Sequence, residues 1–316
     1  MQQIAVSHVI HCMIFFLAAQ LVLSQSDGTI LKRSAHQFAP YSQIPGIQRY
    51  ATEKEQSGVL ADKRFALERL VYSSGGLQVV AYLYHPVEKA ESKYPVIIFN
   101  RGGYRDTNIS LYATMFHRLA AAGFVIVAPM LRGSEGAPGE DEVGGADLQD
   151  VLSASRLAAQ LDYADTSNLF LYGESRGGMM TYQAIREGFP ARAAAVVGAY
   201  TDQAALLDGQ PQLKQLTDKL WAREKPDEAL QRRSARRWPE KISIPILIQH
   251  GAADQSVNPL QSIQMAGKLQ ELHRPYQLVV YDDDGHVLTR NREQRDSAVI
   301  AWFRIHMLRT GMAVPK

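Results

Sequence analysis

The sequence has little cysteine and almost no net charge, and both features exclude classes of function. Its one cysteine, Cys12, lies in an N-terminal segment that we expect to be removed, so the mature chain would carry no thiol. Disulfides, cysteine-based zinc sites and a cysteine nucleophile are then excluded. The 34 basic and 32 acidic residues nearly cancel, which gives no reason to expect nucleic acid as a partner. Length and composition suit one α/β domain without internal repeats.

Charged residues are absent from the first 24 positions, and Val9 to Leu23 is almost wholly apolar. This run is short for a membrane span, which needs about 20 residues, but it suits the core of a secretory signal. Val22-Leu23-Ser24 favours cleavage after Ser24. We therefore predict an exported protein, periplasmic or extracellular, without stable membrane association after cleavage. The segment lacks the usual N-terminal positive charge, so an uncleaved anchor is the alternative.

Residues 25–64 are polar and only weakly periodic, and we interpret them as an arm or a lid. From Leu67 onward, strand and helix patterns alternate through a catalytic domain at 65–316. This order predicts an α/β fold: a mostly parallel eight-stranded sheet, opened by a hairpin, with helices on both faces. The expected strands are 67–73, 79–85, 95–99, 124–128, 169–172, 194–198, 244–249 and 276–281. The expected helices are 110–122, 147–161, the one after residue 175, 260–272 and 293–309.

Residues 201–241 interrupt this alternation, because about 40 residues rich in helix formers separate two strands. We predict a small helical insertion that covers the strand ends as a lid. It contains the basic run Arg-Arg-Ser-Ala-Arg-Arg at 232–237. Such a run is more often a solvated helix face than a device that selects an acidic substrate, and we favour the former.

A serine stands where a buried strand gives way to a helix, in Gly173-Glu174-Ser175-Arg176-Gly177. Gly-x-Ser-x-Gly in this context is typical of a nucleophile elbow, a strained turn that projects the serine hydroxyl clear of the sheet. The following helix would place backbone N–H groups and a positive dipole beside the serine. An ordinary glycine turn is the alternative.

A serine nucleophile needs a general base and an acid that orients the base. On this kind of sheet they follow the serine in the order Asp or Glu, then His. Asp254 follows the strand at 244–249, and His286 follows the strand at 276–281. Because both would lie in loops at the carboxyl ends of strands, we predict the triad Ser175, Asp254 and His286.

The other histidines and carboxylates have simpler explanations. His273 and His306 fall at a helix end and inside the last helix. We expect His250 to support Asp254 through the backbone turn. A solvated acidic turn is the simple interpretation of Asp283 and Asp284, and a metal site that includes His286 is the alternative. No second histidine accompanies them at ligand spacing, so we predict neither metal nor cofactor.

An oxyanion hole requires two donors. One should be the backbone N–H of Arg176, the residue after the nucleophile. The second should come from the loop after the strand at 95–99, as the N–H of Gly102 or Gly103 or the hydroxyl of Tyr104. A plain turn at the two glycines is the alternative.

With these residues placed, the chain resembles the catalytic domain of the prolyl oligopeptidase family of serine peptidases (the S9 group). The resemblance covers about residues 65–310. It rests on the Gly-Gly loop at 102–103, Arg-Gly-Ser-Glu-Gly at 132–136, the doubled glycine at 177–178, His-Gly-x-x-Asp-x-x-Val at 250–257 and Asp-Gly-His at 284–286. It implies the same triad.

The chain departs from that family in ways that bear on the substrate. About 40 residues before the sheet cannot build the usual N-terminal β-propeller. Arg176 stands where tyrosine or histidine is common, and no glutamate pair can be assigned to grip a substrate amino terminus. The resemblance therefore implies the fold and the triad but not proline specificity.

Our hypothesis is an exported serine hydrolase that cleaves short peptides or acyl-peptides through an acyl-enzyme. A carboxylesterase on the same fold is the close alternative, because the elbow serves amides and esters alike. A non-catalytic binding protein on a hydrolase scaffold is the alternative of another class. The expected partner is a small peptide or ester substrate, and no sequence feature indicates an oligomeric state.

Overall fold

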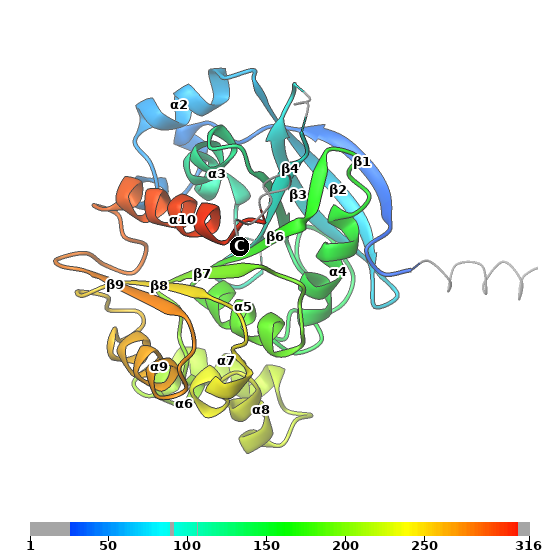
Figure 1. The fold of residues 1–316 in the computed structure, drawn as a ribbon. Coiled ribbons are helices and arrows are strands. Elements are labelled where there is room, and N and C mark those ends of the chain that lie inside the picture. The colour runs from blue at the N-terminus through cyan, green and yellow to red at the C-terminus, as the bar shows by residue number, and fades with distance from the viewer. Residues whose placement is uncertain (1–25, 89–91, 106, 309–316) are drawn as a thin grey trace, which may run out of the picture.

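The computed structural model describes residues 26–88, 92–105 and 107–308 (Figure 1). The predicted signal peptide and its cleavage point lie outside the described residues. Within the described residues, no helix combines the length and the apolar character needed to cross a membrane.

One twisted sheet runs through the centre of the molecule, in the strand order β1-β2-β3-β5-β4-β6-β7-β8-β9 (Figure 1). The first three strands pair antiparallel, as does β3 with β5, and the other pairs are parallel. The predicted α/β class is confirmed. The strands are β1 (Ile30–His36), β2 (Phe65–Ser74), β3 (Leu77–Pro86), β4 (Tyr94–Asn100), β5 (Val125–Pro129), β6 (Ala164–Glu174), β7 (Ala193–Val197), β8 (Ile246–Gly251) and β9 (Tyr276–Tyr281).

The central strands are apolar on both faces because helices cover both. Successive side chains of a strand point to opposite faces. Val96 and Ile98 of β4 accordingly join one hydrophobic cluster, and Ile97 and Phe99 join the other. The first cluster is covered by α4 (Leu148–Ala158), α5 (Arg176–Arg186) and α9 (Leu260–Glu271), and the second by α3 (Ala113–Ala121) and α10 (Arg292–His306).

The sheet has nine strands rather than the eight expected, because β1 pairs along the outer edge of β2. Its sequence, ILKRSAH, is half polar, and each of its side chains is either partly buried or exposed. An edge strand needs few apolar residues, so the hydrophobic pattern of this segment did not predict it.

The rest of the predicted arm packs against the face formed by α3 and α10. It contains the short turns η1 (Tyr41–Gln43) and η2 (Ile47–Arg49) and the helix α2 (Glu53–Ala61). Thr52 caps α2 through a reciprocal hydrogen-bonding pair with Glu55. Glu55 also pairs with Arg118 of α3 and Arg292 of α10. The arm is therefore tied to the body of the domain by charge as well as by apolar contact.

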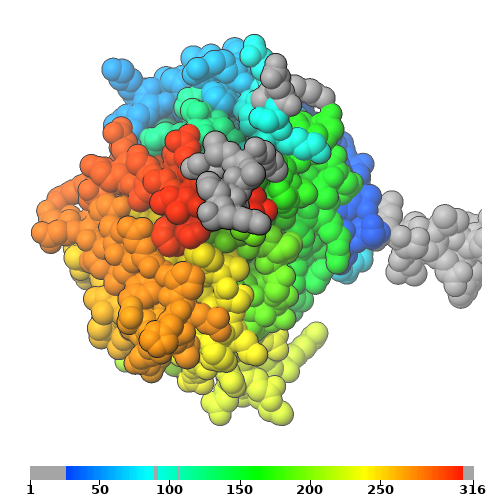
Figure 2. Space-filling model, viewed as in Figure 1, coloured from blue at the N-terminus to red at the C-terminus, as the bar shows by residue number. Residues whose placement is uncertain are grey.

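The insertion between β7 and β8 is helical, as expected, and Figure 2 shows it in yellow-green at the lower edge of the molecule. It consists of α6 (Gln203–Leu207), α7 (Pro211–Leu220), α8 (Pro226–Arg232), η4 (Ala235–Arg237) and η5 (Pro239–Lys241). Trp221 and Trp238 are both buried within it.

The basic run at 232–237 is not simply a solvated face. Arg233 is fully buried, stacks over Trp221 and pairs with Glu224. Arg236 pairs with Asp202. The expectation of a solvated face was wrong for these two arginines, which hold the insertion together instead.

Candidate active site

Ser175 occupies the single residue between the end of β6 and the start of α5. Its backbone has φ 54° and ψ −120°, a conformation that non-glycine residues rarely adopt. The Ser175 N–H donates to the Val197 carbonyl at 2.8 Å, which fixes the turn to the end of β7. The flanking residues Glu174 and Arg176 are buried, whereas Ser175 itself is partly exposed. The strained turn predicted from the sequence is therefore present.

The glycine after Arg176 is required by close packing. A Cβ added to Gly177 would lie 1.9 Å from the carbonyl oxygen of Asn100, at the end of β4. Only a residue without a side chain lets α5 approach the neighbouring strand this closely. That approach brings the loop after β4 alongside Ser175.

The structure brings the three predicted triad residues together. His286 Nε2 lies 2.9 Å from Ser175 Oγ, and His286 Nδ1 lies 2.7 Å from Asp254 Oδ2. The carboxylate can only accept, so Nδ1 carries the proton and Nε2 is left free to accept from the serine hydroxyl. This is the arrangement of nucleophile, base and orienting acid that acyl transfer requires.

Asp254 is held in one orientation by three further hydrogen bonds. Oδ1 accepts the N–H groups of Ser256 and Val257 at 2.7 and 3.0 Å. The His250 ring lies 3.0 Å from Oδ2 and 3.0 Å from the Val257 carbonyl, so its Nε2–H donates to both. His250 therefore supports Asp254 through its side chain, not only through the backbone turn as expected.

Burial acts to raise the pKa of Asp254, but the hydrogen bonds from His250 and His286 outweigh it and hold that pKa well below its ordinary value. Asp254 is thus a carboxylate throughout the neutral range. A fixed negative charge at this point favours a positive charge on the His286 ring when that ring accepts a proton.

The loop that carries His286 is organised by a neighbouring carboxylate. Asp284 is buried, and its Oδ2 accepts the backbone N–H groups of Arg290 and Asn291, while Oδ1 accepts that of Gly285. Asp283 is exposed and pairs with Arg290. The solvated acidic turn proposed for this pair describes Asp283 but is wrong for Asp284.

The predicted oxyanion donors all lie beside Ser175, but the N–H of one of them, Gly102, already has an acceptor. Arg176 opens α5, where backbone N–H groups have no acceptor within the helix. Gly103 and Tyr104 line the same cavity as Ser175 and His286. Gly102 also lies against Ser175, but its N–H donates to the Tyr112 hydroxyl at 3.1 Å. Gly102 is therefore removed from the candidates for the second donor, since its N–H is already used.

The side chain of Arg176 joins the oxyanion loop to the loop before α4. Its guanidinium donates to Asp141 at 2.6 and 2.7 Å, to Asp147 at 2.8 Å and to the Gly103 carbonyl at 3.1 Å. Both aspartates are fully buried, and Arg101 lies 3.7 Å from Asp141. Burial and the neighbouring Arg176 lower the pKa of Arg101 to about 10. Arg176, which departs from the family pattern, thus forms the centre of a buried network of ion pairs.

A cavity of about 210 Å³ opens beside Ser175 and His286. Its walls come from the oxyanion loop, the start of α5 and the helices α6 and α7. Among its described lining residues, Arg176 alone carries a permanent charge, and Asp141 and Asp147 pair with it. Most of the remaining wall is apolar: Val143, Tyr200, Leu206, Leu213, Leu216 and Val257. The insertion predicted as a lid therefore forms part of this cavity.

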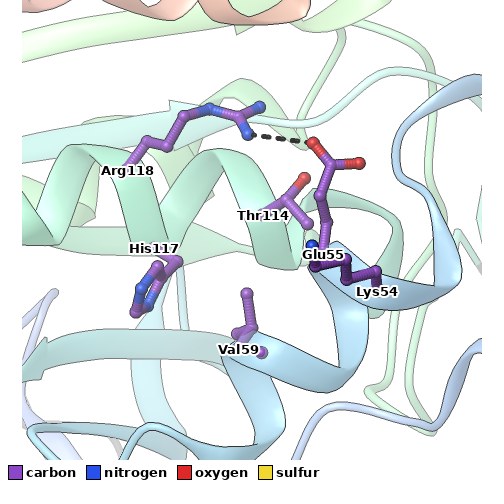
Figure 3. A pocket seen from close by; sticks show the side chains of 7 residues that line it. Lys54, Glu55, Val59, Thr114, His117 and Arg118 are labelled. Carbon is purple, nitrogen blue, oxygen red and sulfur yellow. Dashed lines mark ion pairs between the residues drawn. The ribbon is translucent and has the colours of Figure 1, made fainter.

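A second, wider cavity of about 490 Å³ lies between α2 and α3, away from the serine (Figure 3). Figure 3 shows Lys54, Glu55 and Val59 on one side, and Thr114, His117 and Arg118 on the other. Arg118 pairs with Asp296 and Glu55, and His117 lies 3.5 Å from Asp62, so these side chains stabilise the fold. This cavity contains no counterpart of the Ser175 arrangement.

Several residues of the site were not identified from the sequence. Glu174, directly before the nucleophile, is buried and accepts the Tyr50 and Tyr112 hydroxyls at 3.0 and 3.4 Å. Asp141 and Asp147, the partners of Arg176, were likewise not predicted to belong to the site. Nothing local to these residues reveals their partners, which lie 29 to 124 positions away along the chain.

The sheet, the strained serine turn and the hydrogen-bonded histidine and carboxylate define a serine hydrolase of the α/β-hydrolase fold. The model of the prolyl oligopeptidase family matches residues 110–309. The chain therefore belongs to the prolyl oligopeptidase family, and it is a serine-type peptidase or hydrolase.

Two curated relatives illustrate this membership. The chain is 28% identical over 232 residues to the uncharacterized peptidase YtmA of Bacillus subtilis, covering 72% of this chain and 89% of that protein. It is 25% identical over 257 residues to the human acylamino-acid-releasing enzyme, covering 73% of this chain but 34% of that protein. The chain thus corresponds to most of the first relative and to about a third of the second.

Two solved structures share the fold. The acylaminoacyl peptidase of Pyrococcus horikoshii superposes with a TM-score of 0.66 at 20% identity, over 79% of this chain and 44% of that one. The acetyl xylan esterase of Paenibacillus sp. R4 superposes with a TM-score of 0.64 at 15% identity, over 93% of this chain and 94% of that one. The same fold thus occurs in proteins named for amide and for ester substrates.

Proposed function

We propose that this protein hydrolyses short acyl-peptides through an acyl-enzyme formed on Ser175, with His286 as the base and Asp254 as its orienting acid. The observation that carries the proposal is the pair of short contacts from His286, at 2.9 Å to Ser175 and 2.7 Å to Asp254. The apolar N-terminal segment supports export of the protein to the periplasm or medium.

In the first half-reaction, Ser175 Oγ attacks the substrate carbonyl carbon while His286 Nε2 takes the hydroxyl proton. The carbonyl oxygen becomes an oxyanion, which accepts the Arg176 N–H and a second donor from Gly103 or Tyr104. His286 then returns its proton to the leaving amine as the carbon–nitrogen bond breaks. A water molecule, deprotonated by the same ring, then attacks the acyl carbon. The bond to Ser175 Oγ breaks, His286 returns the proton to Oγ, and the acid is released.

The cavity beside Ser175 supports a neutral, apolar group on the acyl side of the scissile bond. Its free volume of about 210 Å³ is smaller than the roughly 300–1,000 Å³ of sites that hold a whole drug-sized ligand. One aliphatic or aromatic side chain is therefore a better occupant than an extended peptide. None of the described residues that line the cavity is a carboxylate that could pair with a substrate ammonium group, so a blocked amino terminus suits it better than a free one.

Three substrates that share one apolar residue test the proposal: an N-acetyl aminoacyl nitroanilide, the same compound with a free amine, and the matching nitrophenyl ester. We expect the blocked amide to be cleaved with a higher kcat/KM than the free amine. Ser175→Ala should abolish turnover, and His286→Ala should lower it by several orders of magnitude.

Ester hydrolysis without any amide cleavage would overturn the peptidase assignment in favour of a carboxylesterase. Absence of turnover with every substrate, together with tight binding of the blocked peptide to wild-type protein and to Ser175→Ala alike, would support a non-catalytic binding protein instead.

A further inference from the structure

The segment just before α2 contacts the predicted active site from outside the sheet. Tyr50 lies two residues before Thr52, the N-cap of α2, and its hydroxyl donates to Glu174 Oε1 at 3.0 Å. Glu174 immediately precedes Ser175. This hydrogen bond joins two segments that are 124 residues apart in the chain.

From Glu174 the contacts continue to the oxyanion loop. The Tyr112 hydroxyl donates to the same Oε1 atom at 3.4 Å and accepts the Gly102 N–H at 3.1 Å. The rings of Tyr50 and Tyr112 meet edge to face, with centroids 5.6 Å apart. The Gly102 backbone packs against the Glu174 carbonyl and Ser175. One buried carboxyl group thus links the arm, the nucleophile turn and the loop that carries Gly103.

The same segment also holds the loop of the base. The Thr289 hydroxyl, three residues after His286, donates to the Arg49 carbonyl at 3.0 Å. The turn at 47–50 is itself fixed, because the Tyr50 N–H donates to the Ile47 carbonyl at 2.7 Å. Two adjacent residues of the arm therefore contact both loops whose relative position sets the geometry of the reaction.

We propose that Tyr50 is a positioning residue, which acts through Glu174 and Tyr112 to hold the oxyanion loop, while the adjacent Arg49 carbonyl steadies the His286 loop. The inference rests on the proposed function, because it concerns the efficiency of that reaction. It gives the N-terminal arm a catalytic role in addition to its packing. Burial raises the pKa of Glu174, and Arg295 offsets only part of this rise. A hydrogen bond donated by a tyrosine hydroxyl therefore strongly stabilises this buried carboxyl group.

The test is Tyr50→Phe, which removes one hydroxyl and keeps the ring. Loss of alignment in the oxyanion loop should lower kcat about tenfold and leave KM within about twofold, since the interaction matters mainly in the transition state. Tyr82→Phe is the matched control: Tyr82 is buried and its hydroxyl donates to the Glu135 carboxylate at 3.2 Å. Tyr82 belongs to β3, which β5 and β4 separate from β6 in the sheet. This control variant should lose a similar amount of thermal stability and keep its kcat.

Two further variants keep the test informative if Tyr50→Phe folds poorly. Tyr112→Phe breaks the same linkage, and the double variant Tyr50→Phe/Tyr112→Phe should lose less than the product of the single losses, because both act through Glu174. Thr289→Val, at a more exposed contact, should lower kcat by a smaller factor of about two to three.

The proposal is overturned if folded Tyr50→Phe retains the wild-type kcat, or if Tyr82→Phe loses as much kcat as Tyr50→Phe. A change confined to KM would also contradict it. If wild-type protein shows neither turnover nor labelling of Ser175 by a fluorophosphonate, the proposed function itself has failed, and that outcome is distinct from all of these.

Discussion

Replacing Arg176 with methionine should destabilise the protein strongly. The guanidinium is buried and makes four hydrogen bonds, three of them to Asp141 and Asp147, which are themselves fully buried. Without Arg176, Asp141 would keep an ion pair with Arg101 at 3.7 Å, and Asp147 would keep none with the other described residues. Removing one partner of a buried ion pair costs about 3–5 kcal/mol, because an uncompensated charge stays behind. We therefore expect a loss of at least about 3 kcal/mol in the free energy of unfolding.

Equilibrium unfolding in urea measures this loss, with the slope of the transition showing whether the folded state remains compact. The triple variant Arg176→Met/Asp141→Asn/Asp147→Asn removes all three charges and should recover at least half of the lost stability. Arg290→Met is the control, because the Arg290–Asp283 pair is exposed and such pairs contribute about 0–1 kcal/mol. A loss below about 1 kcal/mol for Arg176→Met, or no recovery in the triple variant, would refute this reasoning.

Three other predictions concern different parts of the site. Gly177→Ala should lower the free energy of unfolding by about 1–3 kcal/mol or more and lower kcat, because the added methyl group would collide with the Asn100 carbonyl. Gly267→Ala is the control: Gly267 lies in α9 with open space around it, so this variant should be neutral or stabilising in the same urea titration. The pKa of Asp254 is held below its ordinary value of 3.8, so its stabilising effect is present at neutral pH and is lost as pH falls below about 5. The difference in free energy of unfolding between wild type and Asp254→Asn should therefore shrink from pH 6 to pH 3. A constant difference would contradict the assignment. Leu216→Trp should lower kcat/KM for a phenylalanyl substrate more than for an alanyl one, and equal losses would show that the cavity does not hold the side chain.

The sheet was largely predictable because its central strands are continuous apolar runs. Residues 95–99 and 169–172 gain their apolar character from burial on both faces, and β4 and β6 include them. The strand β1 could not be predicted in this way. It is held by backbone hydrogen bonds to β2, and an edge strand can form these without an apolar sequence pattern.

The juxtaposition of the three predicted triad residues was predictable because each lies at the end of a strand or in the loop that follows it. Ser175, Asp254 and His286 come after β6, β8 and β9, and parallel strands bring their carboxyl ends to one edge of the sheet. The order of the strands along the chain was therefore enough to predict that these three residues lie within hydrogen-bond distance, although up to 111 positions separate them in the sequence.

The supporting contacts could not be derived in the same way. Glu174 is an ordinary charged residue in the sequence, and its burial beside Tyr50 depends on where the arm folds back over the sheet. Arg233 appeared in a basic run and is nevertheless enclosed by Trp221 and Glu224. Such pairs depend on tertiary packing between distant segments, which no local pattern records.

The most direct test of the account is the reaction of the folded protein with a fluorophosphonate, followed by peptide mapping of the adduct. We predict one phosphonyl group per chain, attached to Ser175, with no adduct in Ser175→Ala and a rate of labelling that is reduced by several orders of magnitude in His286→Ala. An unlabelled wild-type protein, an adduct on another serine, or equally fast labelling of His286→Ala would contradict the assignment of Ser175 as a nucleophile activated by His286.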